Sequence, residues 1–199
     1  MGLSQLTEIM IILSILLILI SVFLPKKLKV FDLVKNHFLS FYNDKKATKS
    51  VDWAEIVLIY VLPMFSSIIL INIANVDLSL IKNDLLSIVA IFIGFLLTSL
   101  SILVSIDSSN KDMIYNKLAL ETVNSIGYEI IHAILLMLLI VSDHYISTEL
   151  ANIFDIITLY LLITLFLVLI MIIKRIFSIN KFQLKTSNAN KEIDGKDQN

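Results

Sequence analysis

The stretch "AIFIGFLLTSLSILVSID", residues 90–107, decides the fold class because it is long and apolar enough to cross a lipid bilayer. About 20 helical residues span the hydrocarbon core of a membrane. The predicted spans are Leu6–Leu24, Ala54–Ala74, Leu85–Ile106, Ile126–Val141 and Ile153–Ile173. We therefore expect an all-α, polytopic transmembrane helical bundle with five spans, or with four if the first run lies in the membrane interface.

The composition agrees with a membrane protein and excludes several kinds of chemistry. The 199 residues are 57% hydrophobic and 17% charged, which leaves too few polar side chains to cover a soluble domain. The chain has no cysteine, so disulfides, thiol catalysis and cysteine-ligated metals are excluded. With only two prolines and four glycines, a carrier built on broken helices is disfavoured. No hydrolase, zinc-protease or phosphate-loop motif occurs, so we expect neither enzyme activity nor a cofactor.

The basic residues predict the orientation in the membrane. Of the 16 Lys and Arg residues, all but Lys82 lie before the second span, between the third and fourth spans, or after the fifth. Basic loops stay in the cytoplasm. We therefore expect a multi-pass protein of the inner (cytoplasmic) membrane, with its N-terminus outside and its C-terminus in the cytoplasm.

The first basic loop carries a helical pattern of its own. Apolar side chains recur at helical spacing between polar ones, and three lysines precede them. These residues are Lys26, Lys27 and Lys29, followed by Phe31, Val34, Phe38 and Phe41. The pattern predicts an amphipathic helix over residues 27–43 that lies on the inner leaflet and contacts membrane lipids, or that docks a cytosolic protein; the two roles are compatible. We count it within a transmembrane domain of residues 1–180, followed by a disordered polar tail of residues 181–199.

A stripe of small and hydroxyl-bearing residues follows one side of the third span. It consists of Ser87, Gly94, Thr98, Ser101 and Ser105, which fall on one narrow helical face. Small residues let helices approach closely, so we expect this face to pack between subunits or against a neighbouring span. Two alternatives are the lining of an oligomeric pore and a groove for a lipid or ligand.

Three residues inside the spans are candidates for a special role. Glu129 and His132 are three residues apart and share a face of the fourth span, where ionisable groups are costly. They form either a pair that positions the helix or a proton sensor. Glu-x-x-His is also di-iron spacing, but a single copy does not make such a site, and we expect no metal. Pro63 removes a backbone hydrogen bond within the second span and predicts a kink, either passive or acting as a hinge.

With its stripe in "FIGFLLTSLSILVSID", its lysine-rich first inner loop and its small outer loops, the chain resembles the KwaA family, the membrane subunits of the bacterial Kiwa antiphage defence systems. The resemblance covers the architecture of the whole chain, although that family is associated with four spans. It implies a non-enzymatic, homo-oligomeric sensor in the bacterial inner membrane. Such a subunit recruits a cytosolic DNA-binding partner, KwaB, and passes on envelope disturbance during phage injection, without binding nucleic acid itself.

The leading expectation is thus a membrane sensor or scaffold that self-associates and signals to a cytosolic protein. An oligomeric ion channel or membrane-permeabilising effector is the first alternative, with the stripe lining its pore. An immunity protein against a bacteriocin has the same size and hydropathy and is the second alternative.

Overall fold

The computed structural model describes residues 10, 13–14, 17, 20, 30–43, 50–51, 53–76, 78, 80–105, 113–143 and 148–196. The predicted first span, Leu6–Leu24, lies almost entirely outside the described residues. Lys26, Lys27 and Lys29 also lie outside them.

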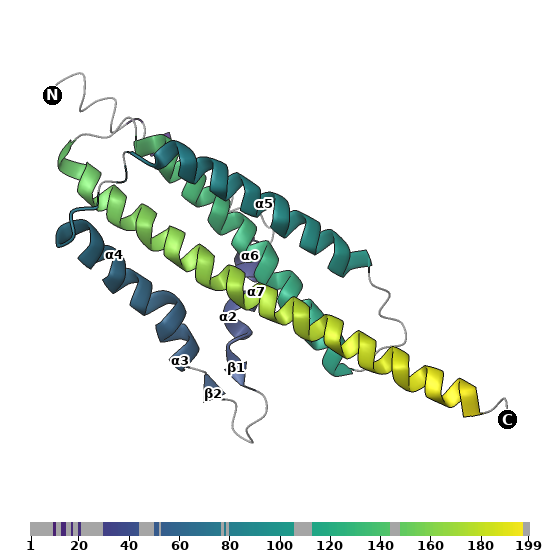
Figure 1. Cartoon of the computed structure of the whole chain (residues 1–199). Coiled ribbons are helices and arrows are strands. Elements are labelled where there is room, and N and C mark those ends of the chain that lie inside the picture. Colours follow the sequence, from purple (N-terminus) through teal and green to yellow (C-terminus); the bar gives the residue numbers. More distant parts are fainter. Residues whose placement is uncertain are drawn as a thin grey trace.

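The described chain is helical apart from one minimal strand pair, which confirms the all-α class (Figure 1). The elements are α2 (Val30–Leu39), β1 (Tyr42–Asn43), β2 (Ser50–Val51), α3 (Trp53–Ile56), the π-helical turn η1 (Val57–Val61), α4 (Leu62–Asn72), α5 (Lys82–Ser105), α6 (Met113–Asp143) and α7 (Thr148–Lys196). The two strands pair antiparallel, with Tyr42 opposite Val51.

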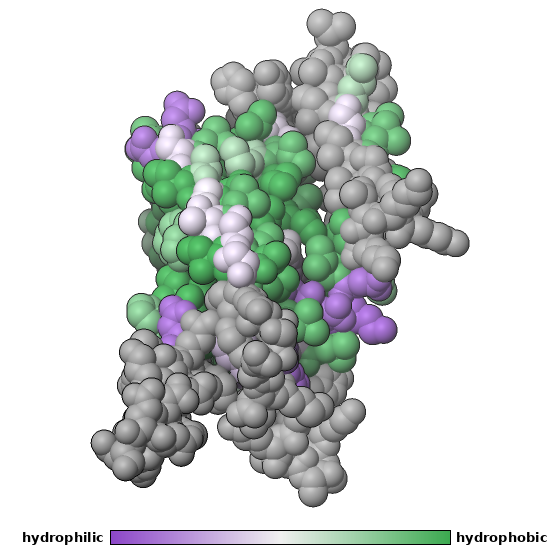
Figure 2. All heavy atoms as spheres, turned by 90° about the vertical axis from the view of Figure 1, so that its right-hand side faces the viewer, coloured by the Kyte–Doolittle hydropathy of each residue, from purple (hydrophilic) through white to green (hydrophobic). Residues whose placement is uncertain are grey.

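Four helical segments are long and apolar enough to cross a membrane. They are Trp53–Asn72, Lys82–Ser105, Tyr115–Asp143 and Leu150–Lys181. Each corresponds to one of the last four predicted spans, so four helices of the predicted length and apolar character are confirmed, while the fifth span stays a prediction. On the face seen in Figure 2, most of the described side chains are apolar, a paler band runs down the middle, and the most hydrophilic residues lie at the margins. Such a surface is suited to lipid.

Helix α7 is the axis of the bundle. It packs against α6 on one side and against η1 and α4 on the other, while α5 packs on α6 (Figure 1). We call the two ends of the bundle the Trp53 end and the Asn72 end. The four segments alternate in direction (Figure 1), so Ser105, Tyr115 and Lys181 belong to the Trp53 end, and Lys82, Asp143 and Leu150 to the Asn72 end.

The buried apolar side chains form two clusters along the bundle. The cluster at the Trp53 end includes Phe41, Ile59, Ile126 and Ile172. The cluster at the Asn72 end includes Leu85, Leu136 and Leu162. Phe92 packs against both, so the two clusters meet near the middle of the spans.

Helix α7 continues to Lys196, into the segment for which the sequence predicts a disordered tail. No proline occurs in its 49 residues, and its single glycine, Gly195, stands beside the helix end. Without a helix breaker, the polar residues extend the apolar helix that precedes them.

Pro63 follows a π turn rather than standing in regular α-helix. The backbone N–H of Leu62 bonds to the carbonyl of Val57, five residues earlier, and Pro63 occupies the first turn of α4. A proline in a helix interior normally clashes with the preceding turn. The wider π turn accommodates the ring, and the kink predicted at Pro63 stays a prediction.

Candidate functional site

The most polar part of the described interior is centred on His37 of α2. Its side chain is fully buried, although α2 precedes all four described spans. The Nε2 atom lies 2.7 Å from the Tyr60 hydroxyl in η1, and Nδ1 lies 3.2 Å from Oγ of Ser125 in α6. One side chain thus joins α2 to two transmembrane segments, and both of its ring nitrogens have partners.

Aromatic contacts hold the imidazole of His37 in one orientation. It stacks on Tyr128 with ring centroids 4.1 Å apart and an interplanar angle of 6°. Phe41 meets it edge-on at 5.4 Å, and Phe38 lies against Tyr60 at 5.3 Å. Stacking and edge contacts of this kind add to the apolar burial of the rings.

Arg175 of α7 completes the group by linking three helices. Its guanidinium donates to Ser125 Oγ in α6 and to Ser40 Oγ just after α2, both at 3.2 Å. Since Ser125 accepts from Arg175, its own hydroxyl hydrogen is free to point at His37 Nδ1. We call His37, Ser40, Tyr60, Ser125, Tyr128 and Arg175 the α2 anchor.

The α2 anchor corrects the predicted face of the amphipathic helix. Val30, His37 and Phe41 are buried, whereas Phe31 is 70% exposed and Phe38 is 39% exposed; Val34 is half-buried. The predicted apolar face consists of Phe31, Val34, Phe38 and Phe41 and does not include His37. The stripe is rotated because the bundle offers hydrogen-bond partners to the imidazole, which makes its burial favourable.

Gly127 sets how closely α2 approaches α6. A Cβ atom placed on Gly127 would lie 3.2 Å from a methyl carbon of Leu33. Any larger side chain must therefore displace the side chain of Leu33. The glycine permits the short separation that brings His37 within reach of Ser125.

The pKa of His37 is lowered to about 3 from its ordinary value. Burial is the largest cause, followed by the charge of Arg175 and then that of His132. The imidazole is therefore neutral near pH 7, as its place between two hydroxyls and beside a guanidinium requires.

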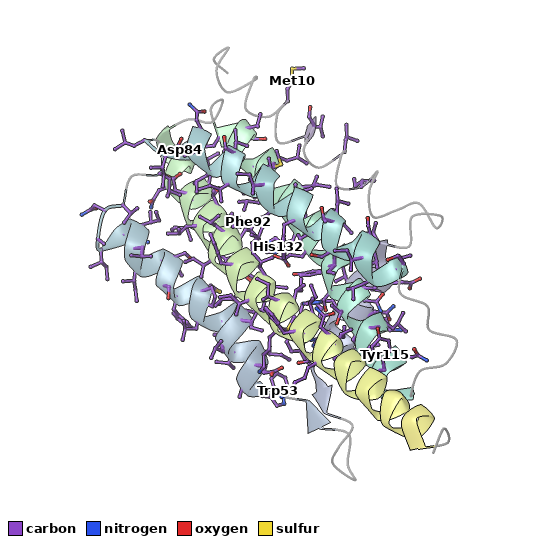
Figure 3. The ribbon with its side chains drawn as sticks, turned by 45° about the vertical axis from the view of Figure 1, so that its right-hand side comes forward. Met10, Trp53, Asp84, Phe92, Tyr115 and His132 are labelled. Atoms are coloured by element: carbon purple, nitrogen blue, oxygen red, sulfur yellow. The ribbon has the colours of Figure 1, made fainter. Side chains whose placement is uncertain are left out.

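Glu129 and His132 lie deeper in the bundle, between the two apolar clusters. Both are buried, and Nδ1 of His132 lies 3.3 Å from a carboxyl oxygen of Glu129. Apart from this contact, no described group forms a hydrogen bond of good geometry with either side chain. Figure 3 shows His132 and Phe92 near the middle of the bundle, far from Trp53 and Asp84 at its ends. The structure thus brings the predicted pair together, and both its positioning role and its role as a proton sensor stay predictions.

The stripe on α5 points away from the described bundle. Helix α5 buries Leu85, Val89, Leu96 and Leu103, whereas Ser87, Gly94, Thr98, Ser101 and Ser105 are all exposed. The hydroxyls bond to carbonyls of their own helix, as Thr98 does to Gly94 at 2.8 Å, and a Cβ on Gly94 would meet nothing within 4 Å. Packing against a neighbouring described span is therefore wrong for this face. Packing between subunits and pore lining both stay open as predictions.

The Asn72 end carries a separate ionic cluster. The ammonium of Lys82 pairs with Asp143 of α6 and lies 3.3 Å from Asp155 of α7. Nearby, the Asn152 amide donates to the side-chain oxygen of Asn72 at 3.1 Å. Lys82, the one basic residue predicted on the outer side of the membrane, therefore connects α5 with α6 and α7.

Sequence reasoning missed every member of the α2 anchor. A signal was available in α6, where buried Thr122, Ser125, Glu129 and His132 recur at spacings of three and four. A polar stripe with this period on a spanning helix indicates buried partners elsewhere in the bundle. It does not say that those partners come from a segment before the spans.

No group of three or more His, Asp or Glu side chains within the described ranges is placed to hold a metal ion. The sequence matches no protein-family model and no curated protein, and the fold matches no solved structure.

Proposed function

We propose that this protein is a non-enzymatic, multi-pass inner-membrane sensor or scaffold that self-associates and signals to a cytosolic partner through α2. The Trp53 end faces the cytoplasm, in line with the distribution of basic residues. A role in antiphage defence, with a KwaB-like partner, follows only from the resemblance to the KwaA family.

The α2 anchor is the observation that carries this proposal. A helix outside the spans is held in the bundle by hydrogen bonds to η1, α6 and α7. A change in the packing of those spans therefore changes the environment of His37 and with it the position of α2. Such a linkage is what a two-state signal between the membrane and the cytosol needs.

The opposite face of α2 supports partner docking. Phe31 is 70% exposed, and Asp32 and Lys35 beside it are exposed as well. Aromatic residues are enriched at the centres of protein interfaces, and charged residues are typical of their rims. The outward α5 stripe, from Gly94 to Ser105, gives self-association a separate surface on the other side of the bundle.

The test is to purify the tagged protein in mild detergent from its native locus and to measure the mass and composition of the complex. The proposal expects a symmetric oligomer that carries a stoichiometric cytosolic protein. Phe31→Ala should release that protein and leave the oligomer intact. Phe177→Ala is the matched control, because Phe177 is 69% exposed but lies on α7.

Other outcomes count against the proposal. If the Phe31→Ala variant still carries the partner, α2 is not the docking surface. If the purified protein is a monomer, it does not self-associate. An oligomer without a partner would favour the channel alternative. Ion flux in liposomes that disappears in Ser101→Leu and Ser105→Leu would then establish a pore lined by the α5 stripe.

A further inference from the structure

A groove of about 350 Å³ lies between the start of the first described span and α7. Its walls are apolar over most of their length and include Leu58, Ile170 and Met171. Charged side chains occur in it only as Glu55 and Lys174, both of which are exposed. The groove is therefore amphipathic, with a long apolar part and charges of both signs.

The position of Trp53 indicates where the groove lies relative to the lipid headgroups. This residue is 69% exposed and stands two residues before Glu55, at the end of the bundle seen in Figure 3. Tryptophan is enriched at the level of the lipid headgroups. Glu55 thus lies near the headgroups, while Leu58 and Ile170, further along the spans, lie in the hydrocarbon region.

We propose that this groove binds one zwitterionic phospholipid with a primary ammonium, of the phosphatidylethanolamine class. An acyl chain fills the apolar part, Lys174 pairs with the phosphate, and Glu55 accepts hydrogen bonds from the ammonium. Glu55 interacts electrostatically with Arg175 as well, but the side chains of Glu55 and Lys174 are both exposed, so a headgroup can reach them.

The two charges select among headgroups. An anionic phosphatidylglycerol headgroup satisfies Lys174 but meets repulsion from Glu55. A phosphatidylcholine headgroup carries the right charges but has no N–H to donate to the carboxylate. A primary ammonium beside a phosphate satisfies both residues, which makes phosphatidylethanolamine the preferred occupant.

The walls of the groove also carry the α2 anchor. Ile59, which lines the groove, is next to Tyr60 in η1, and Lys174 is next to Arg175 in α7. A lipid between these walls therefore lies directly behind the hydrogen bonds that hold His37. The lipid site itself does not depend on the proposed signalling function.

The experiment measures lipid binding to the purified, delipidated protein by native mass spectrometry. Phosphatidylethanolamine, phosphatidylcholine and phosphatidylglycerol are added back separately. We expect one tightly bound phosphatidylethanolamine, with a dissociation constant roughly tenfold below that of phosphatidylglycerol, as one well-placed charged contact provides. No partner protein is needed, so failure here is distinct from failure of the proposed function.

Matched variants locate the site. Ile170→Trp fills the groove and should abolish the tight binding, whereas Ile153→Trp, at a 52% exposed position on the same helix, should not. Lys174→Gln should weaken binding of all three phospholipids, whereas Lys181→Gln should not. Glu55→Gln should remove the preference for phosphatidylethanolamine over phosphatidylglycerol.

Two results would overturn the proposal. Equal binding by Ile170→Trp and Ile153→Trp would show that the groove is not the site. Equal affinity of the wild type for phosphatidylethanolamine and phosphatidylglycerol would show that Glu55 and Lys174 do not discriminate between the two headgroups.

Discussion

The imidazole Nε2 of His37 lies 2.7 Å from the hydroxyl of Tyr60, and this contact joins a helix outside the spans to the π turn of the first described span. π turns interrupt regular α-helices and often occur at functional sites. Here the π turn accommodates Pro63 and also presents Tyr60 to α2. The irregular backbone and the buried histidine are therefore parts of one arrangement.

Replacement of His37 by alanine should loosen α2 without unfolding the spans. The change leaves Tyr60 and Ser125 without their imidazole partner and opens a cavity beside Tyr128. We expect a loss of about 2–4 kcal/mol in stability. Thermal unfolding in detergent and hydrogen exchange of the α2 peptide measure it. Asn36→Ala, at an exposed position of the same helix, is the control; an equal effect of both variants would contradict the anchor.

Acidification should weaken the α2 anchor through His37. Its pKa is lowered to about 3 in the folded protein, mainly by burial and then by Arg175 and His132, against 6.5 in the unfolded chain. The unfolded state therefore binds the extra proton below pH 6.5. This contribution to stability is complete above pH 6.5 and is lost progressively as the pH falls toward 3.

The size of this effect at pH 4 is roughly 3 kcal/mol. It is measured as the difference in pH dependence of melting temperature between the wild type and His37→Gln, whose amide forms hydrogen bonds but does not titrate. Carboxylates titrate in both proteins and cancel in the comparison. Parallel pH profiles for the two proteins would show that His37 is not buried neutral.

Gly127 and Gly94 should respond differently to the same substitution. Gly127→Leu must displace Leu33, so we expect about 1–3 kcal/mol of overpacking and faster proteolysis near α2. In Gly94→Leu the new side chain meets no described neighbour, so α2 stays protected while self-association through the α5 stripe decreases. Limited proteolysis and the mass of the complex separate the two effects. Equal protease sensitivity would refute the close approach of α2 to α6.

Removal of Lys82 should destabilise the Asn72 end. In Lys82→Met, Asp143 and Asp155 keep their negative charges near each other in a partly buried site and lose the ammonium between them. We expect a loss of about 2–4 kcal/mol. The double variant Lys82→Met with Asp143→Asn should recover part of it, because one of the two carboxylates is then neutral. Melting temperatures of the four proteins of this cycle measure the coupling. If the effects of Lys82→Met and Asp143→Asn on the melting temperature were strictly additive, the two residues would not be coupled.

The spans could be predicted from sequence because lipid imposes a strong local rule. Leu85–Ile106 was predicted and Lys82–Ser105 is observed, and the other three matched spans agree as closely or are longer at their polar ends. The ends differ because residues such as Tyr115 continue a helix that the apolar run has started. Hydropathy locates only the apolar stretch, whereas backbone hydrogen bonds extend the helix into the polar residues beside it.

The α2 anchor could not be predicted because its contacts are distant in sequence. His37 is 88 residues from Ser125, and Ser40 is 135 residues from Arg175. Periodicity predicts an interfacial helix over residues 27–43, and the structure has α2 at Val30–Leu39; that this helix lies on the membrane surface stays a prediction. Periodicity cannot decide between Phe38 and His37, because that choice depends on hydroxyl groups supplied by other helices.

Arg175 has a consequence for the biosynthesis of the protein. The ribosome makes α2 before any of the four described spans, yet the guanidinium that bonds Ser40 is made after nearly all of them. The nascent chain therefore carries Ser40 and Ser125 without the guanidinium of Arg175 until α7 has been made. Completion of α7 closes the site, so docking of α2 reports that the last span has been inserted correctly.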